Sequence, residues 1–159
     1  MRRIASLLVV VGTLMALQAG TALARGGGWE PLPSDPFDAD LCGTTIHFEF
    51  PVNKEYVKFV PLPGGVTLVK ITGSFTALMT DLNTGTSLEE NVSGPARSLS
   101  NPDGSYEFIA QGLTLFLGLP DRPEILISRG LVDVLYLADG SVQVKRMNQN
   151  IIDVCALLT

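Results

Sequence analysis

The 159-residue chain has little of the chemistry that most metal proteins and enzymes use. It contains one histidine, two cysteines and one tryptophan, and charged residues make up only 17% of it. One imidazole and two thiols cannot build a metal centre that needs several His or Cys ligands, so neither a metal nor any other cofactor is predicted. The net charge of −5 excludes a basic footprint as the main surface, so no nucleic-acid partner is predicted.

The remaining composition is that of a small globular protein. Hydrophobic residues make up 46% of the chain, which is too many for a disordered segment. At this length a single folded domain is the expected organisation.

The first 24 residues have the three parts of a secretory signal peptide. Arg2 and Arg3 are followed by an uncharged apolar run over residues 4–17, and an Ala-Leu-Ala sequence ends at Ala24. The alternative, an uncleaved anchor, needs about 20 apolar residues to span a bilayer. We therefore expect residues 1–24 to be removed between Ala24 and Arg25, and the mature chain to be secreted without stable membrane insertion.

Cys42 and Cys155 are the only cysteines, and both lie in the exported part of the chain. An even number of cysteines outside the reducing cytosol predicts a disulfide. The alternatives are two free thiols or a bond between two chains. An intramolecular bond would tie the beginning of the folded domain to its end.

Residues 25–41 have a composition that opposes regular structure. Gly26, Gly27 and Gly28 are followed by three spaced prolines and several acidic residues. This pattern predicts a flexible leader over 25–41, and the folded β domain is expected to occupy residues 42–159.

From Cys42 onward the chain alternates between strand-like runs and turn sequences. Residues 45–50 alternate between polar and apolar side chains, and residues 66–81 do so over a longer run with Gly73 at the expected bend. Turns containing Gly or Pro separate about eight such runs. We therefore predict an all-β fold, either a single antiparallel β-barrel of about eight strands or a sandwich, closed by one disulfide. The barrel is preferred because closure would bring Cys42 and Cys155 together and remove exposed edges.

Several turn sequences also suggest a relationship to other proteins. They are Gly73–Ala77, Asp81–Gly85, Asn91–Pro95 and Asn101–Ser105, followed by Arg129-Gly130, Asp139-Gly140 and the terminal Asp153-Val154-Cys155. With these motifs the chain resembles small secreted all-β proteins of actinomycete-type bacteria. The resemblance implies secretion and an all-β fold. It supplies no catalytic residue, because that group has no assigned activity.

Two pairs of polar residues are candidate sites. His47 and Glu49 lie two residues apart in one predicted strand, so both side chains point from the same face and could act as an acid–base pair. Arg129 and Asp133 likewise share one face of a largely apolar run, where they would form an ion pair. The aspartates at 35, 38 and 40 lack the spacing of a calcium-binding loop. In each case the simpler interpretation is a set of polar residues on a solvated face.

No catalytic triad or nucleophile motif accompanies these residues. The predicted function is therefore that of a secreted, non-catalytic β protein that binds a partner or forms part of a structure or surface. One alternative is a barrel that binds a small apolar ligand. Another is a cofactor-free isomerase or hydrolase that uses His47 and Glu49. The expected partner is a small apolar molecule or an extracellular protein.

Overall fold

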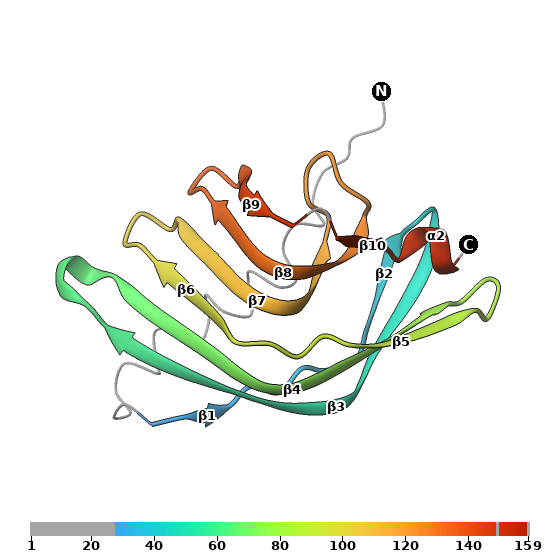
Figure 1. The fold of residues 1–159 in the computed structure, drawn as a ribbon, viewed down its shortest axis with the longest axis horizontal. Coiled ribbons are helices and arrows are strands. Elements are labelled where there is room, and N and C mark those ends of the chain that lie inside the picture. The colour runs from blue at the N-terminus through green and yellow to red at the C-terminus, as the bar shows by residue number, and fades with distance from the viewer. Residues whose placement is uncertain (1–27, 149, 159) are drawn as a thin grey trace.

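The computed structural model describes residues 28–148 and 150–158, so the predicted signal peptide and its cleavage site at Ala24 and Arg25 lie outside it. Within the described residues, ten antiparallel strands form one sheet (Figure 1). They are β1 (Glu30–Pro31), β2 (Phe37–Leu41), β3 (Thr44–Pro61), β4 (Thr67–Asp81), β5 (Ser87–Asn91), β6 (Ala96–Ser100), β7 (Tyr106–Leu117), β8 (Ile125–Tyr136), β9 (Val142–Met147) and β10 (Ile151–Asp153). A 3₁₀ turn, η1 (Pro63–Gly65), precedes β4, and a short helix, α2 (Cys155–Leu158), follows β10.

The sheet is open, and the predicted barrel is not formed. Its main path runs β1-β3-β4-β6-β7-β8-β10, with β2 paired to β3, β5 to β4 and β9 to β8. The long strands β3, β4 and β8 therefore have different neighbours at their two ends. We call the end that carries β2, β5, β10 and α2 the disulfide end, and the end that carries β1, β6 and β9 the far end. Figure 1 shows these strands curving side by side without meeting in a closed ring.

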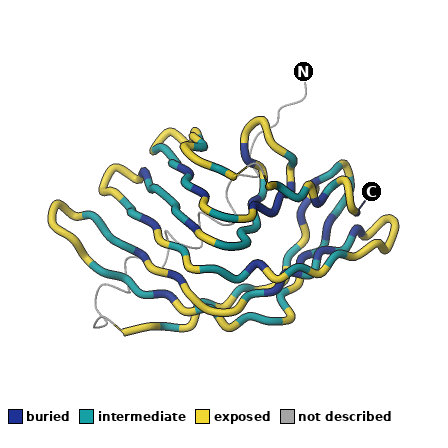
Figure 2. Tube along the Cα trace, in the orientation of Figure 1, coloured by how far each residue is buried: buried dark blue, intermediate teal, exposed yellow. Residues whose placement is uncertain are grey.

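At the disulfide end the sheet folds over and packs on itself. Ile46 and Phe48 of β3 belong to the same buried cluster as Ile125 and Ile127 of β8. The strands β2, β3 and β4 thus form one layer, and β7, β8, β10 and α2 form the layer that covers it. Figure 2 shows buried segments at this end and also further along the long strands.

A second core on the opposite face of β8 explains why the sheet does not close into a barrel. Leu126 and Val132 belong to a separate cluster that includes Phe116, and Phe108 packs against that cluster. The wall of a small barrel has one face toward the core and one toward solvent. Because both faces of β8 are buried at Leu126 and Ile127, this strand lies inside a layered structure.

The described part of the predicted leader contains regular structure. Residues 37–41 form β2, which pairs along the first part of β3, and the Phe37 ring stacks on Phe48 with centroids 4.7 Å apart. Pro33 and Pro36 lie before β2. Pro31 lies in β1, which is at an edge of the sheet. Near the C-terminus only Ile151–Asp153 are extended, and α2 follows them.

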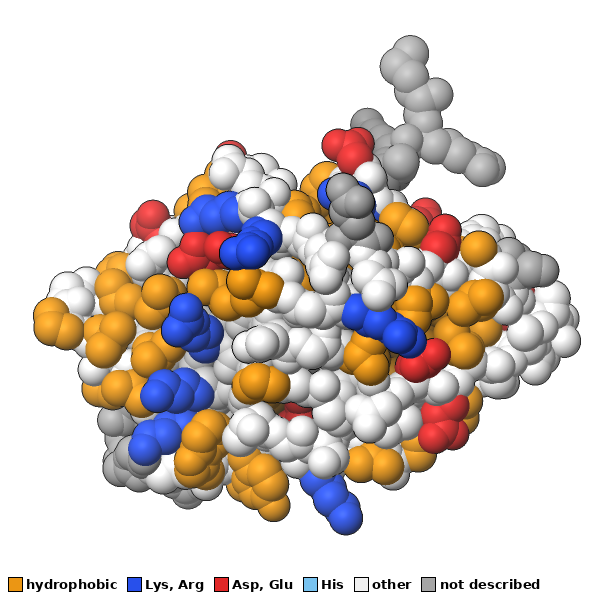
Figure 3. Space-filling model, viewed as in Figure 1, with side chains coloured by type: hydrophobic (Ala, Val, Ile, Leu, Met, Phe, Trp, Pro, Cys, Tyr) orange, Lys and Arg blue, Asp and Glu red, His pale blue; other side chains and the backbone are white. Residues whose placement is uncertain are grey.

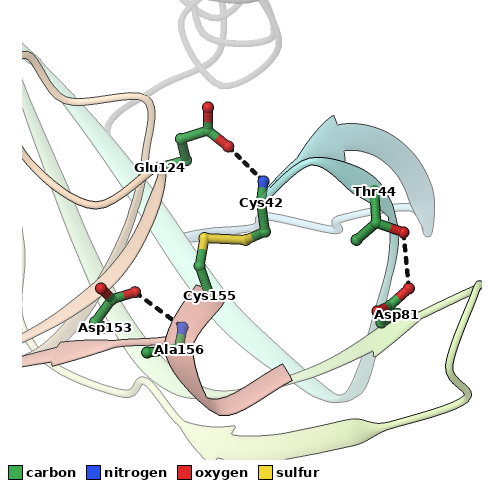
Figure 4. The surroundings of a disulfide bond; sticks show 7 residues. All are labelled: Cys42, Thr44, Asp81, Glu124, Asp153, Cys155 and Ala156. Atoms are coloured by element: carbon green, nitrogen blue, oxygen red, sulfur yellow. Dashed lines mark hydrogen bonds between the residues drawn. A yellow bond between two sulfur atoms is a disulfide. The ribbon is translucent and has the colours of Figure 1, made fainter. Parts of the chain in front are cut away.

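The Cys42–Cys155 disulfide is present, as predicted, and it joins the two edges of the sheet at this end (Figure 4). Cys42 and Gly43 form the two-residue turn between β2 and β3, with φ values of 58° and 74° that match the turn type preferred in tight hairpins. Cys155 begins α2, where Asp153 accepts a hydrogen bond from the Ala156 backbone N–H. Packing of the two layers, and not hydrogen bonding between edge strands, brings the cysteines together.

In the described part of the chain, no helix is long and apolar enough to span a membrane.

Candidate functional site

The predicted pair His47 and Glu49 is part of an exposed ionic cluster. Register places Asp38 of β2 directly opposite His47, and the imidazole Nδ1 lies 2.5 Å from Asp38 Oδ1. The other ring nitrogen, Nε2, lies 3.9 Å from Glu49 Oε1. Asp38 therefore holds the ring at Nδ1, whereas the distance between Nε2 and Glu49 is too long for a hydrogen bond.

Two hydroxyl groups continue this row across the sheet. Thr80 lies opposite His47, Ser87 lies opposite Thr80, and their hydroxyl oxygens are 2.9 Å apart. A catalytic triad needs a nucleophile hydrogen-bonded to the imidazole, together with free N–H donors for the oxyanion. Among the described residues His47 bonds to neither hydroxyl, and the nearby backbone groups belong to the ladders of β2–β5. The geometry supports a polar sheet face better than a hydrolase site.

Arg129 and Asp133, the second predicted pair, do not form an ion pair. They lie four residues apart along β8, and Gly130 lies between them with φ of 113°. Asp133 instead lies beside Glu107, Lys145 and Arg97. Burial raises the pKa of Asp133, the Glu107 charge raises it further, and the two cations oppose this shift. Lys145 pairs directly with Glu107.

Arg129 has a different setting, at the edge of a shallow hollow. The residues that line this hollow are Asn91, Ser93, Gly112, Leu113, Arg129 and Gly130. It is open to solvent and formed partly by backbone at the bend of β7 and β8. Such a hollow lacks the enclosure that an apolar ligand site needs.

One group of potential metal ligands lies around the disulfide. The sulfur atoms of Cys42 and Cys155 and a carboxylate oxygen of Glu124 lie within 4.8 Å of one another. Both sulfurs are joined in the disulfide, and zinc and related metals bind thiolates. Glu124 accepts a hydrogen bond from the Cys42 backbone N–H, so its position is explained by the turn that it stabilises (Figure 4).

Sequence reasoning missed a row of three cations. Lys58 in β3 lies directly opposite Lys70 in β4, and Lys70 lies directly opposite Arg97 in β6. Adjacent strands are about 4.8 Å apart, so the three side chains leave the sheet side by side. Figure 3 shows Lys and Arg side chains gathered on this face over β3, β4 and β6.

These three cations have no ion-pair partner among the described residues, where the carboxylates in ion pairs engage only His47 and Lys145. Like charges directly opposite each other destabilise a sheet by roughly 0.2–1 kcal/mol per pair. The row therefore opposes folding at two successive strand pairs. Local arrangements that disfavour the fold are expected where a function requires them.

Apolar and aromatic side chains border the row on the same face. Val60, Leu68 and Leu99 are half-buried and form a parallel row of cross-strand neighbours. Each lies two residues from the cation of its own strand. Tyr56 is 45% exposed on the other side of the row, and Trp29 is 48% exposed. Because Glu30 pairs with Val57, Trp29 lies next to Lys58 at the end of the row. We call the surface formed by these eight residues the cationic face.

Several exposed acidic residues lie at the disulfide end of the sheet, away from the row of cations. Asp38 and Asp40 of β2, Glu49 of β3 and Glu89 of β5 are exposed at the disulfide end. The strands β3 and β4 thus carry negative charge near one end and positive charge near the other. This separation explains why the net charge of −5 conceals a local basic surface.

Comparison of the chain with models of protein families, with characterised proteins and with solved structures finds no match.

Proposed function

We propose that the chain is an exported, non-catalytic binding protein whose cationic face takes an anionic partner. The observation that carries this proposal is the direct cross-strand alignment of Lys58, Lys70 and Arg97, none of which forms an ion pair within the described residues, although Arg97 lies near Asp133. An anion placed over the row would relieve the mutual repulsion of the three side chains. The row of cations would then account both for the binding of the anion and for the local destabilisation of the sheet.

Three other functions receive less support. The isomerase or hydrolase alternative needs a reactive partner for the His47 imidazole, whereas the nearby Thr80 and Ser87 hydroxyls bond to each other and not to His47. The alternative of a barrel that encloses an apolar ligand needs an inner cavity. In this sheet the interior is filled by the clusters around Phe48 and Phe116. A role as a structural or surface component that binds no ligand would leave the row of cations unexplained.

Export is part of the proposal. A disulfide that closes a separation of 113 residues is stable in an oxidising compartment and is not maintained in a reducing cytosol. The basic n-region, the apolar run and the residues around Ala24 support the same location. The partner is accordingly sought outside the cell.

The proposal is tested by retention of the mature chain, residues 25–159, on a carboxylate cation exchanger at pH 7 and low salt. Loss of Arg2 and Arg3 makes this chain more acidic than the precursor, so retention requires a local basic surface. We expect wild type to be retained and Lys70→Gln to elute early. Lys54→Gln, which removes the same charge four residues along β3 from Lys58, is the matched control.

Retention of wild type and of Lys54→Gln, but not of Lys70→Gln, supports the proposal. Flow-through of the wild-type protein contradicts it. Equal loss of retention in the two variants also contradicts it, because binding would then depend on total charge and not on the row.

A further inference from the structure

We infer that the anionic partner is a linear acidic polysaccharide that lies across β3, β4 and β6, with successive carboxylates over successive cations. This inference rests on the proposed function and names the partner of the same surface. It follows from three properties of the cationic face: the spacing of its charges, its aromatic border and its limited width.

The charges form a line and not a cluster. Lys58, Lys70 and Arg97 stand on three consecutive strands of one ladder, so they repeat at the strand spacing of about 4.8 Å. A single small anion would have to draw the three side chains together, away from this linear spacing. A polyuronate carries one carboxylate on each sugar ring, and a sugar ring is about as long as this spacing. Such a chain can place consecutive carboxylates over the entire row.

The two exposed aromatic side chains fit sugar rings. Trp29 stands at the β1 end of the row beside Lys58, and Tyr56 lies two residues from Lys58 along β3. Both rings are about half exposed, and neither is among the stacked aromatic pairs of the described residues. The C–H faces of sugars pack on flat aromatic surfaces, whereas the charged row holds the carboxylates. The two kinds of group together recognise an acidic sugar chain.

The width of the basic surface argues against broader anionic partners. Glu49 of β3 and Glu89 of β5 are exposed toward the disulfide end. Glu107 of β7 lies directly opposite Leu99 of β6. A membrane surface or a nucleic-acid duplex laid on this face would also meet these carboxylates. A single narrow chain running along the row avoids them. The favourable contact is therefore limited to a ligand that is one polysaccharide chain wide.

The test uses galacturonate oligomers from the monomer to the tetramer, added to the mature protein at low salt. Trp29 is the only tryptophan of the chain, so its fluorescence reports binding at the end of the row. We expect affinity to rise by roughly tenfold or more from monomer to trimer, because each added carboxylate reaches another cation without a new loss of translational freedom. Lys70→Gln should remove this gain, and Lys54→Gln should retain it.

Fully methyl-esterified oligomers, anionic phospholipid vesicles and duplex DNA are the comparison ligands. Equal affinity for all oligomer lengths, equal binding of the methyl esters, or binding to vesicles or DNA alone would overturn the polysaccharide assignment. If the protein is held by the cation exchanger through Lys70 but binds no oligomer, the polysaccharide is wrong and the proposed function stands. If neither binding occurs, both are wrong.

Discussion

Gly112 of β7 lies directly opposite Gly130 of β8, and both have positive φ values, 111° and 113°. This pair bends the β7–β8 hairpin without a change of register. The bend brings Phe108 and Phe116 of one strand into a T-shaped contact with ring centroids 6.0 Å apart. It therefore creates the second core and sets the angle between the two halves of the sheet.

Replacement of Gly130 should destabilise the protein through this bend. An added Cβ would lie 2.9 Å from Asn148 Nδ2, and an L-residue rarely adopts the Gly130 φ value. We expect Gly130→Ala to lower the free energy of unfolding by about 1–3 kcal/mol in urea titrations. Gly118→Ala is the control, since Gly118 has φ of 66° and open space around its Cβ position. An equal loss in the two variants would show that the bend is not under steric constraint.

The disulfide should contribute strongly to stability. In the chain-entropy model, closing a loop of this length stabilises the folded state by about 4–5 kcal/mol. We expect the double variant Cys42→Ser/Cys155→Ser to lose most of this amount, measured by denaturant unfolding of the oxidised wild type and the variant. Reduction of the wild type should reproduce the loss. A reduced protein as stable as the oxidised one would contradict the role assigned to the cross-link.

Phe37 tests whether the described part of the expected leader is a structural element. Its ring stacks on Phe48 and lies against the main core. Removal of a large aromatic side chain from such a contact is expected to lower the free energy of unfolding by roughly 2–4 kcal/mol. Asp35→Ala, an exposed position two residues earlier, is the control. No loss in Phe37→Ala would mean that this segment does not contribute to the core.

Asp81 should make stability depend on acidic pH. The backbone N–H of Asn83, followed by the hydroxyls of Thr44 and Thr84, lowers the pKa of this carboxyl below its ordinary value of 3.8. Since the folded-state pKa is the lower one, the stabilisation is present above pH 3.8 and is lost as pH falls through the folded-state pKa.

We therefore expect Asp81→Asn to be less stable than wild type at pH 7, with the difference shrinking below pH 4. Thermal unfolding followed across this pH range measures the effect, and Asp121→Asn at an exposed turn serves as the matched control. A constant difference between wild type and Asp81→Asn at all pH values would show that Asp81 acts through shape and not through charge.

Local features of the fold could be predicted from the sequence because they depend on neighbouring residues. Alternation along residues 66–81 indicates a strand, and the positive φ of Gly73 confirms the expected bend. The even number of cysteines and the expected export of the chain were enough to predict the disulfide. The segment around Phe37 was assigned incorrectly, since the prolines before it masked a short strand that needs β3 as its partner.

Features that depend on register could not be predicted. Two core faces on β8 arise from the bend at Gly130, and alternation alone gives one face per strand, which favours a barrel. Lys58, Lys70 and Arg97 each look like ordinary surface residues of separate strands. Only pairing of β3 with β4 and of β4 with β6 brings them into one row.

The central claim is that the cationic face is the binding surface, and backbone and indole NMR signals of the mature protein test it most directly. In a titration with trigalacturonate at low salt, we predict the largest shifts at Lys58, Lys70, Arg97 and the Trp29 indole N–H. Signals near His47 at the disulfide end should change little. Shifts centred on His47 and Asp38, or none anywhere in the described sheet at saturating ligand, would contradict the claim.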